Sequence, residues 1–248
     1  MSADLRATDL SLGTRLKGVT VALRSGEVTA ICGPNGAGKS TLLSCLAGLT
    51  VSDAGAVTLE GEALSALPAR RRAQAIGYLP QGPEVAWDVT VDVLVALGRL
   101  PWQDASSPQG QAAVEAAIAT MDLQPLRTRP VSRLSGGERA RALMARVLAT
   151  QPRWLLADEP LASLDVGQAL ALMKRLREQA DAGRGVVLVL HDLATAMNHA
   201  DRVIVLKDGR LATDGEPDQS LAADIIGAVW GCEARWLGEP GTRALSVS

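Results

Sequence analysis

The sequence lacks phenylalanine, has one tyrosine, and only 2% of its 248 residues are aromatic. A buried core must therefore consist mainly of leucine, valine, isoleucine and alanine. Three cysteines are too few, and odd in number, for a disulfide framework, which indicates a reducing compartment. No apolar run approaches the roughly 18 residues that cross a bilayer. The first residues also lack the layout of a signal peptide, so we expect any membrane contact to be peripheral.

An excess of charge of one sign is also missing. The 25 Lys and Arg nearly balance 27 Asp and Glu, which gives a formal net charge of −2. This balance argues against a nucleic-acid partner held by bulk charge, and we expect none. A hydrophobic fraction of 47% excludes disorder of the whole chain. The basic run at residues 70–72 is interpreted as the solvated face of a helix.

Short apolar runs alternate with helical stretches along much of the chain. This alternation is typical of an α/β fold with a mostly parallel sheet. The runs are continuous rather than alternating, which predicts strands buried on both faces. The expected strands of this sheet are residues 28–32, 76–79, 154–157, 186–190 and 203–206, and a turn at residues 207–210 predicts a final hairpin.

The pattern changes between residues 82 and 152, where helical stretches follow one another without a strand signal. The expected helices cover residues 91–99, 109–121 and 136–148. We interpret residues 82–152 as a helical subdomain inserted into a sheet core. Residues 1–81 and 153–248 form that core, so that residues 1–248 make one domain.

The strongest motif is a glycine followed by four residues and Gly-Lys-Ser, between an expected strand and an expected helix. Its glycines let backbone N–H groups turn toward phosphate oxygens, and the helix N-terminus adds positive potential. Lys39 would reach the terminal phosphates of ATP, and the Ser40 hydroxyl would ligate Mg²⁺. The candidate nucleotide-binding residues are Gly33, Pro34, Asn35, Gly36, Ala37, Gly38, Lys39, Ser40 and Thr41.

A second motif places two acids at the end of an expected buried strand, Asp158 and Glu159. Such a placement is costly unless the acids act at the strand exit. Asp158 would hold Mg²⁺, and Glu159 would accept a proton from the attacking water. A surface turn with two solvated carboxylates is the alternative, which the upstream phosphate loop makes weak.

A third motif, Leu-Ser-Gly-Gly-Glu at residues 134–138, precedes an expected helix. Ser135 is a good N-cap, and the two glycines at a helix N-terminus suit an anion. One ATP does not need two such helix ends from one chain. We therefore expect Ser135, Gly136 and Gly137 to serve an ATP held by a second copy of the chain, although an ordinary capped helix start is the alternative.

These motifs, together with Ser-Leu-Asp at residues 163–165, resemble the ATP-binding cassette ATPases over essentially the whole chain. The resemblance implies a P-loop NTPase (RecA-like) fold, with a mostly parallel sheet core, an N-terminal antiparallel β part and an inserted helical subdomain. It places Gln81 at the family's Q-loop glutamine, where it also ligates metal, and His191 at its switch histidine. It further implies a head-to-tail dimer that sandwiches two ATP molecules, with Asp165 crossing the interface.

Among the branches of the family, an importer subunit fits best. We expect no fused membrane helices, as exporters have, and no long insertion, as DNA-repair relatives have. Residues 90–99 with Pro101 resemble the branch that serves uptake of ferric siderophore, haem and cobalamin. The resemblance implies an ATPase at the cytoplasmic face of the inner membrane, bound to a transmembrane permease and indirectly to a substrate-binding protein. A soluble non-transport ATPase and an exporter subunit stay open, as does the cargo.

One feature departs from the family. Its members usually carry an aromatic residue shortly before the phosphate loop, where it stacks on adenine, and no aromatic residue occurs between Met1 and Tyr78. An aliphatic contact from Leu12 or Leu16, or the guanidinium of Arg15, would have to take its place. We expect such a contact to discriminate little between bases.

Overall fold

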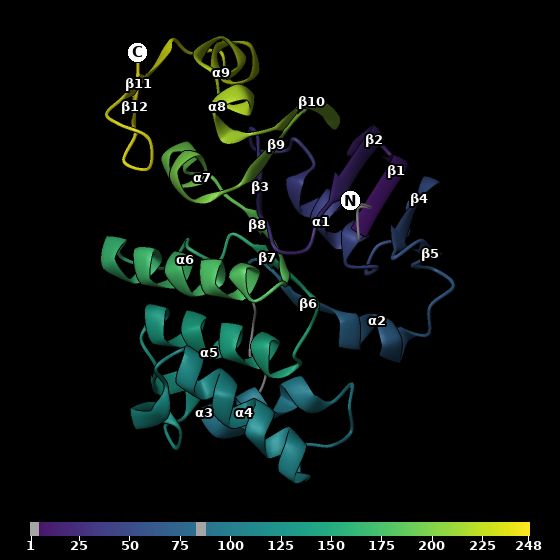
Figure 1. Ribbon diagram of the computed structural model, residues 1–248, viewed down its shortest axis with the longest axis vertical. Coiled ribbons are helices and arrows are strands. Elements are labelled where there is room, and N and C mark those ends of the chain that lie inside the picture. Colours follow the sequence, from purple (N-terminus) through teal and green to yellow (C-terminus); the bar gives the residue numbers. More distant parts are fainter. Residues whose placement is uncertain (1–4, 83–87) are drawn as a thin grey trace.

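A six-stranded sheet forms the centre of the computed structural model, which describes residues 5–82 and 88–248 (Figure 1). All neighbouring strands pair in parallel except β10, which forms an antiparallel hairpin with β9. Every residue of β3, β7 and β8 is buried, which explains their continuous apolar sequences. The order is β10 (Arg210–Gly215), β9 (Arg202–Lys207), β3 (Val28–Cys32), β8 (Gly185–Val189), β7 (Trp154–Asp158) and β6 (Ile76–Leu79). The predicted mostly parallel α/β fold is confirmed.

A second, antiparallel sheet comes mainly from the N-terminal part of the chain. Its order is β2 (Leu16–Leu23), β1 (Leu5–Leu12), β4 (Ala54–Leu59) and β5 (Glu62–Ala63). Helix α1 (Lys39–Leu46) lies between this sheet and the central strands (Figure 1). Its leucines share one core cluster with residues of both sheets, which fixes the start of α1 against the end of β3.

Helices cover the other face of the central sheet in two layers. Figure 1 shows α6 (Val166–Asp181) next to the sheet and α5 (Gly136–Ala149), α3 (Val91–Ala96) and α4 (Pro108–Thr120) below it. The helix predicted for residues 91–99 ends as an α-helix at Ala96 and continues as a 3₁₀ turn over Leu97–Arg99. In this turn Gly98 passes so close to α5 that an added Cβ would lie 2.1 Å from the Arg146 carbonyl oxygen.

The C-terminal part folds over the end of the central sheet. It contains α7 (Leu193–His199), α8 (Pro217–Ser220), α9 (Ala223–Trp230) and the hairpin of β11 (Ala234–Leu237) and β12 (Ala244–Val247). Figure 1 shows these elements at the top of the molecule. Across residues 5–82 and 88–248, none of the helices combines the length and the apolar character that a bilayer crossing requires.

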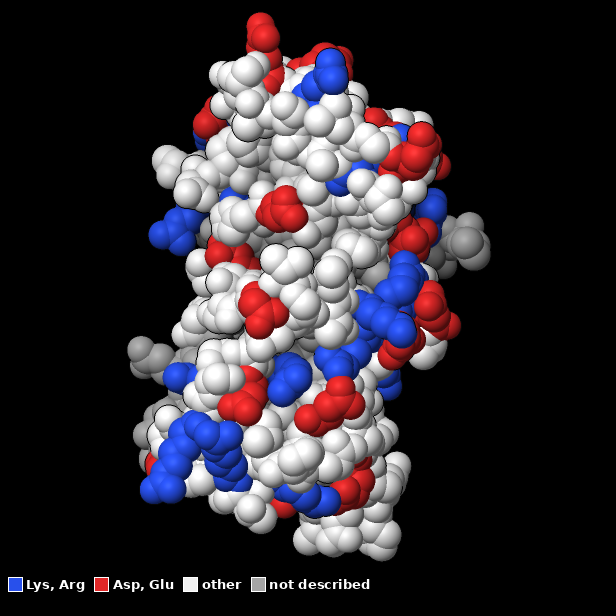
Figure 2. Space-filling model, turned by 90° about the vertical axis from the view of Figure 1, so that its left-hand side faces the viewer, with Lys and Arg blue, Asp and Glu red and all other residues white. Residues whose placement is uncertain are grey.

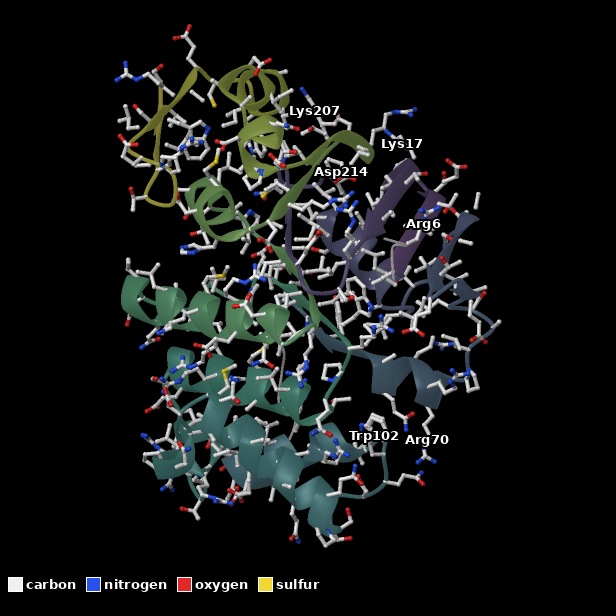
Figure 3. All side chains as sticks on the ribbon, in the orientation of Figure 1. Arg6, Lys17, Arg70, Trp102, Lys207 and Asp214 are labelled. Atoms are coloured by element: carbon white, nitrogen blue, oxygen red, sulfur yellow. The ribbon has the colours of Figure 1, made fainter. Side chains whose placement is uncertain are left out.

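The short helix α2 (Ala69–Ala75) carries the basic run at residues 70–72. The interpretation of this run as a solvated face is wrong for Arg72, which is half-buried and donates to the carbonyl of Leu67 at 2.7 Å. Arg70 is exposed but donates to the carbonyls of Pro101 and Trp102, and Figure 3 shows Arg70 and Trp102 side by side. The run therefore fastens α2 to the neighbouring loops.

Charges of both signs are interleaved on the face that Figure 2 shows. In this view, lysine and arginine gather mainly in the lower half of the molecule. Several of the arginines in the layer of α3, α4 and α5 are paired. Arg127 contacts Asp92 at 3.1 Å and Glu115 at 2.6 Å, and these partly exposed pairs contribute little to stability.

Candidate functional site

The phosphate-loop sequence forms the connection from β3 to α1. Gly33 has a φ of 147° and an added Cβ would lie 2.2 Å from the Leu206 carbonyl oxygen. Gly38 has a φ of 100°, and its Cβ would lie 2.4 Å from the Arg15 carbonyl oxygen. Glycine is therefore required at both ends of the loop, because any side chain would strain the backbone and collide with a neighbouring strand or turn.

Lys39 lies over this loop. Its Nζ donates to the carbonyl of Gly33 at 2.8 Å and to that of Pro34 at 3.0 Å, and the residue is 6% exposed. Burial lowers the pKa of Lys39, although the nearby Glu159, Cys32 and Asp158 each raise it. A buried ammonium group at the mouth of a glycine loop favours a bound anion such as phosphate.

Three predicted site residues from neighbouring strand ends meet at one point. Gln81 follows β6, Glu159 follows β7 and His191 follows β8. Gln81 Nε2 donates to Glu159 Oε2 at 2.9 Å, and His191 Nε2 lies 2.5 Å from Glu159 Oε1. Glu159 has a φ of 51°, an unfavourable left-handed conformation for a glutamate. Such strain often occurs at functional sites, and here it accompanies a carboxylate held by two polar side chains.

Asp158, the last residue of β7, is only 3% exposed. Burial raises the pKa of its carboxyl group, and a hydrogen bond from Ser40 lowers it. Its Oδ1 is buried and has no hydrogen-bond partner among the residues that the structure describes. An unpaired buried carboxylate oxygen beside a serine hydroxyl fits a hard cation such as Mg²⁺.

Protein side chains alone do not complete a metal site here. Within the described ranges, no group of three or more His, Cys, Asp or Glu side chains is arranged to hold a metal ion. Mg²⁺ commonly uses one or two carboxylates together with water and substrate phosphates. Asp158 and Ser40 therefore suit a metal that arrives with a phosphate ligand.

An open cavity of about 700 Å³ joins the phosphate loop to Gln81, Glu159 and His191. A cavity of this size accommodates a nucleotide. It brings together most of the residues predicted for the nucleotide and the reaction, and it adds Arg15 from the turn between β1 and β2. The lining residues are Arg15, Asn35, Gly36, Ala37, Gly38, Lys39, Ser40, Thr41, Gln81, Glu159 and His191.

The remaining predicted residues lie apart from that lining. Ser135 caps α5 by accepting from Glu138 N, while the Glu138 carboxylate accepts from Ser135 N at 2.8 Å. Gly136 instead lines a second cavity of about 370 Å³, together with Gln81, Asp158 and Glu159. Asp165 is exposed and caps α6 by accepting from Gln168 N at 2.8 Å. The predicted residues outside the described lining of the first cavity are therefore Gly33, Pro34, Ser135, Gly136, Gly137, Asp158 and Asp165.

Sequence reasoning missed Asp192, which follows His191. Its carboxylate caps α7 by accepting from Ala194 N at 3.1 Å and Thr195 N at 3.0 Å. The cap fixes the start of α7 at Leu193, two residues beyond His191. An aspartate directly before an apolar helical pattern is the signal that predicts such a cap.

The arrangement suits phosphoryl transfer to water. A glycine loop with a buried lysine can bind phosphate. An aspartate and a serine provide oxygen ligands for a metal, and a further carboxylate can accept a proton. Glu159 is the candidate for that carboxylate because its two oxygens are held by Gln81 and His191 inside the same cavity.

Comparison with known proteins agrees with this chemistry. A family model described as ABC transporter matches residues 16–162. The hemin import ATP-binding protein of Streptomyces coelicolor is 42% identical over 94% of this chain and 83% of its own length. The cobalamin import ATP-binding protein of Halobacterium salinarum is 37% identical over the whole chain and 63% of its own length.

Solved structures show the same fold. The cbiO1 protein of Clostridium perfringens, part of an ABC transporter complex, aligns with a TM-score of 0.79 and 28% identity over 91% of this chain and 93% of its own. A dimeric ATP-binding cassette in a post-hydrolysis state, bound to ADP and phosphate, aligns with a TM-score of 0.77 and 26% identity over 86% of this chain and 98% of its own.

Proposed function

This chain belongs to the ABC transporter family, and from that premise we propose that it is the ATP-hydrolysing subunit of an importer for a metal chelate. The observation that carries the proposal is the cavity that joins the phosphate loop to the Gln81–Glu159–His191 cluster. ATP binding follows from the family, and the residues below are our assignment of its site.

The phosphate loop and Lys39 bind the triphosphate. Ser40 and Asp158 would hold Mg²⁺, with Gln81 as a further ligand, and the metal would supply positive charge against the phosphates. Glu159 accepts a proton from the attacking water, and His191 keeps the γ-phosphate and the water in line. Gln81 lies beside Glu159 in the described arrangement, so its movement toward the metal would release one Glu159 oxygen for the water.

A second copy of the chain completes each ATP site. Ser135 and Gly136 are exposed at the N-terminus of α5, Gly137 is buried behind them, and none of the three lines the cavity that contains the phosphate loop. Asp165 is exposed at the start of α6. Two apolar residues of the same helix are also exposed, Val166 with an exposed fraction of 79% and Leu170 with 52%. We propose that this exposed surface contacts the partner copy in a head-to-tail dimer, where Asp165 helps to align the two ATP sites.

The helical stretch at residues 82–152 acts as a subdomain that docks a transmembrane permease. The sheet core of residues 1–81 and 153–248 holds the nucleotide, and Gln81 lies at the junction of the two parts. This division supports coupling, because a contact made on the helices reaches the ATP through Gln81. The chain then works as a peripheral subunit at the cytoplasmic face of the inner membrane, with a substrate-binding protein as an indirect partner.

The proposal on cargo rests on relatives. Those compared here are named for import of hemin and of cobalamin, both of which are metal chelates. Uptake of a ferric siderophore, haem or cobalamin is therefore the proposed class of transport. We propose that the permease and the binding protein, rather than this chain, select among the three.

Co-purification from native membranes tests the import proposal. We expect a permease and a substrate-binding protein to accompany the tagged chain. Cysteine pairs between residues 88–100 and a cytoplasmic loop of that permease should crosslink. Recovery of a complex without any membrane protein, or failure of a broad set of cysteine pairs in an intact complex, would contradict the proposal and favour a non-transport ATPase.

A further inference from the structure

The order of strands in the central sheet places different groups on the two sides of the phosphate loop. Strands β8, β7 and β6 lie on one side of β3, and their ends carry His191, Glu159 and Gln81. Strands β9 and β10 lie on the other side, and the turn between them contacts the phosphate loop through a hydrogen bond from Gly209 N to the Ala37 carbonyl at 3.2 Å. A nucleotide whose terminal phosphate faces Glu159 must therefore extend its nucleoside toward the β9–β10 side.

Arg15 stands on that second side. The carbonyl of Arg15 lies against both neighbouring turns, since an added Cβ would lie 2.4 Å from it at Gly38 and 2.7 Å from it at Gly209. Arg15 N donates to the Leu12 carbonyl at 2.9 Å, and Lys17 N donates to the Gly209 carbonyl at 2.8 Å. The backbone of Arg15 is thus held by three segments, which orders its position before any ligand binds.

The side chain of Arg15 lines the cavity and is exposed. Within residues 5–82 and 88–248, no hydrogen bond or ion pair engages its guanidinium group. None of the described residues that line the cavity is Phe, Tyr or Trp, and the imidazole of His191 is engaged by Glu159 on the other side of the loop. A planar, unengaged cation is therefore the group in this lining that can lie flat on a nucleobase.

We propose that the guanidinium of Arg15 is the platform on which the purine base of the nucleotide stacks. The proposal deepens the ATPase function proposed above and rests on it. Stacking contacts the face of the base, which adenine and guanine share, and leaves its hydrogen-bonding edge unread. The site therefore accepts ATP and GTP nearly equally, and the triphosphate with Mg²⁺ supplies most of the affinity.

Lys17 offers a matched control for charge. It lies two residues after Arg15, near the start of β2, is exposed, and does not belong to the described cavity lining. Figure 3 shows its side chain extending outward from the end of β2. Arg15→Ala and Lys17→Ala each remove one positive charge, but only Arg15→Ala removes the side chain that lines the cavity and is proposed to stack on the base.

The test measures binding of Mg²⁺ complexes of three probes by calorimetry: β,γ-imido ATP, β,γ-imido GTP and inorganic tripolyphosphate. We expect Arg15→Ala to weaken both nucleotide analogues about two- to fivefold, as loss of an exposed cation–π contact implies. Binding of tripolyphosphate should stay unchanged, and Lys17→Ala should change none of the three. Arg15→Trp should bind both nucleotide analogues at least as tightly as the unmodified chain.

Three results would overturn the platform. The first is unchanged binding of both nucleotide analogues in Arg15→Ala. The second is a loss of tripolyphosphate binding in Arg15→Ala as large as the loss of nucleotide binding, which would make Arg15 a phosphate contact. The third is a preference for the ATP analogue over the GTP analogue above about tenfold. Failure of the unmodified chain to bind any of the three probes would instead contradict the proposed ATPase function. The two failures are therefore distinguishable in one set of titrations.

Discussion

Arg99 is a deeply buried charged side chain in the helical layer. It is 1% exposed, although it is a guanidinium. Its Nη1 donates to the Ala149 carbonyl at 2.8 Å and to Gln151 Oε1 at 3.2 Å, and two further nitrogens bind both oxygens of Asp104. The guanidinium carbon lies 5.2 Å from the centre of the Trp102 ring. Arg99 thus ties the 3₁₀ turn to the end of α5.

Arg99→Ala should reduce the free energy of unfolding by about 3 to 5 kcal/mol. The buried carbonyl of Ala149 would lose its donor, which costs about 1–3 kcal/mol. The space left by the long side chain adds a cavity cost of about 2 kcal/mol or more. Arg70→Ala is the control, because Arg70 also donates to backbone carbonyls of this segment but is exposed. It should cost less than about 1 kcal/mol.

Urea unfolding followed by circular dichroism gives the free energy of unfolding of both variants and of the unmodified chain. Arg99 holds the pKa of the Asp104 carboxyl below its ordinary value, chiefly by hydrogen bonding. This contribution is fully present above the ordinary aspartate pKa near 4 and is lost as pH falls through the lower folded value. The difference in free energy of unfolding between the unmodified chain and Arg99→Ala should therefore become smaller at low pH. A loss below about 1 kcal/mol at pH 7, equal to that of Arg70→Ala, would refute this reasoning.

Three further predictions concern the site and the thiols. Burial raises the pKa of Asp158, so its ionised form costs stability above that pKa. Asp158→Asn should raise the melting temperature of the nucleotide-free protein at pH 7.5, with a gain that disappears at low pH, and calorimetry should show weaker binding of MgATP. Burial raises the pKa of the Cys32 thiol to about 12 and also raises that of Cys45. Iodoacetamide at pH 8 should label Cys232 first in the folded protein and all three cysteines after unfolding, as mass spectrometry would show; rapid labelling of Cys32 would contradict its burial. Gly33→Ala should abolish measurable ATP binding, because a Cβ there meets a backbone carbonyl at 2.2 Å; binding within about threefold of normal would contradict that geometry.

The sequence predicts the central sheet well because burial on both faces leaves room only for apolar residues. Strands β3, β7 and β8 illustrate this, since each matches a continuous apolar run to within a residue or two. The phosphate loop is likewise predictable, because Gly33 and Gly38 adopt backbone conformations that other residues resist. The meeting of Gln81, Glu159 and His191 follows from neighbouring strand ends, but the hydrogen bonds of Gln81 and His191 to Glu159 depend on side-chain positions that the sequence pattern does not specify.

Features that depend on distant partners escape such reasoning. Arginine is mostly exposed in proteins, and the burial of Arg99 depends on its hydrogen bonds to Asp104 and to the end of α5. The pairing of β11 with β12 is not predicted either, because both strands are short and partly exposed and carry little apolar signal. The shortening of the predicted helix 91–99 has the same kind of cause, the close passage of Gly98 against α5.

The central claim is that Glu159 takes a proton from water attacking an ATP held by the phosphate loop. Steady-state turnover and MgATP affinity in Glu159→Gln test it most directly, because glutamine keeps the shape of the side chain and removes the proton acceptor. We predict ATP affinity close to that of the unmodified chain and turnover lower by about 10²- to 10⁴-fold. Turnover within a fewfold of the unmodified chain, with ATP bound equally well, would contradict the claim.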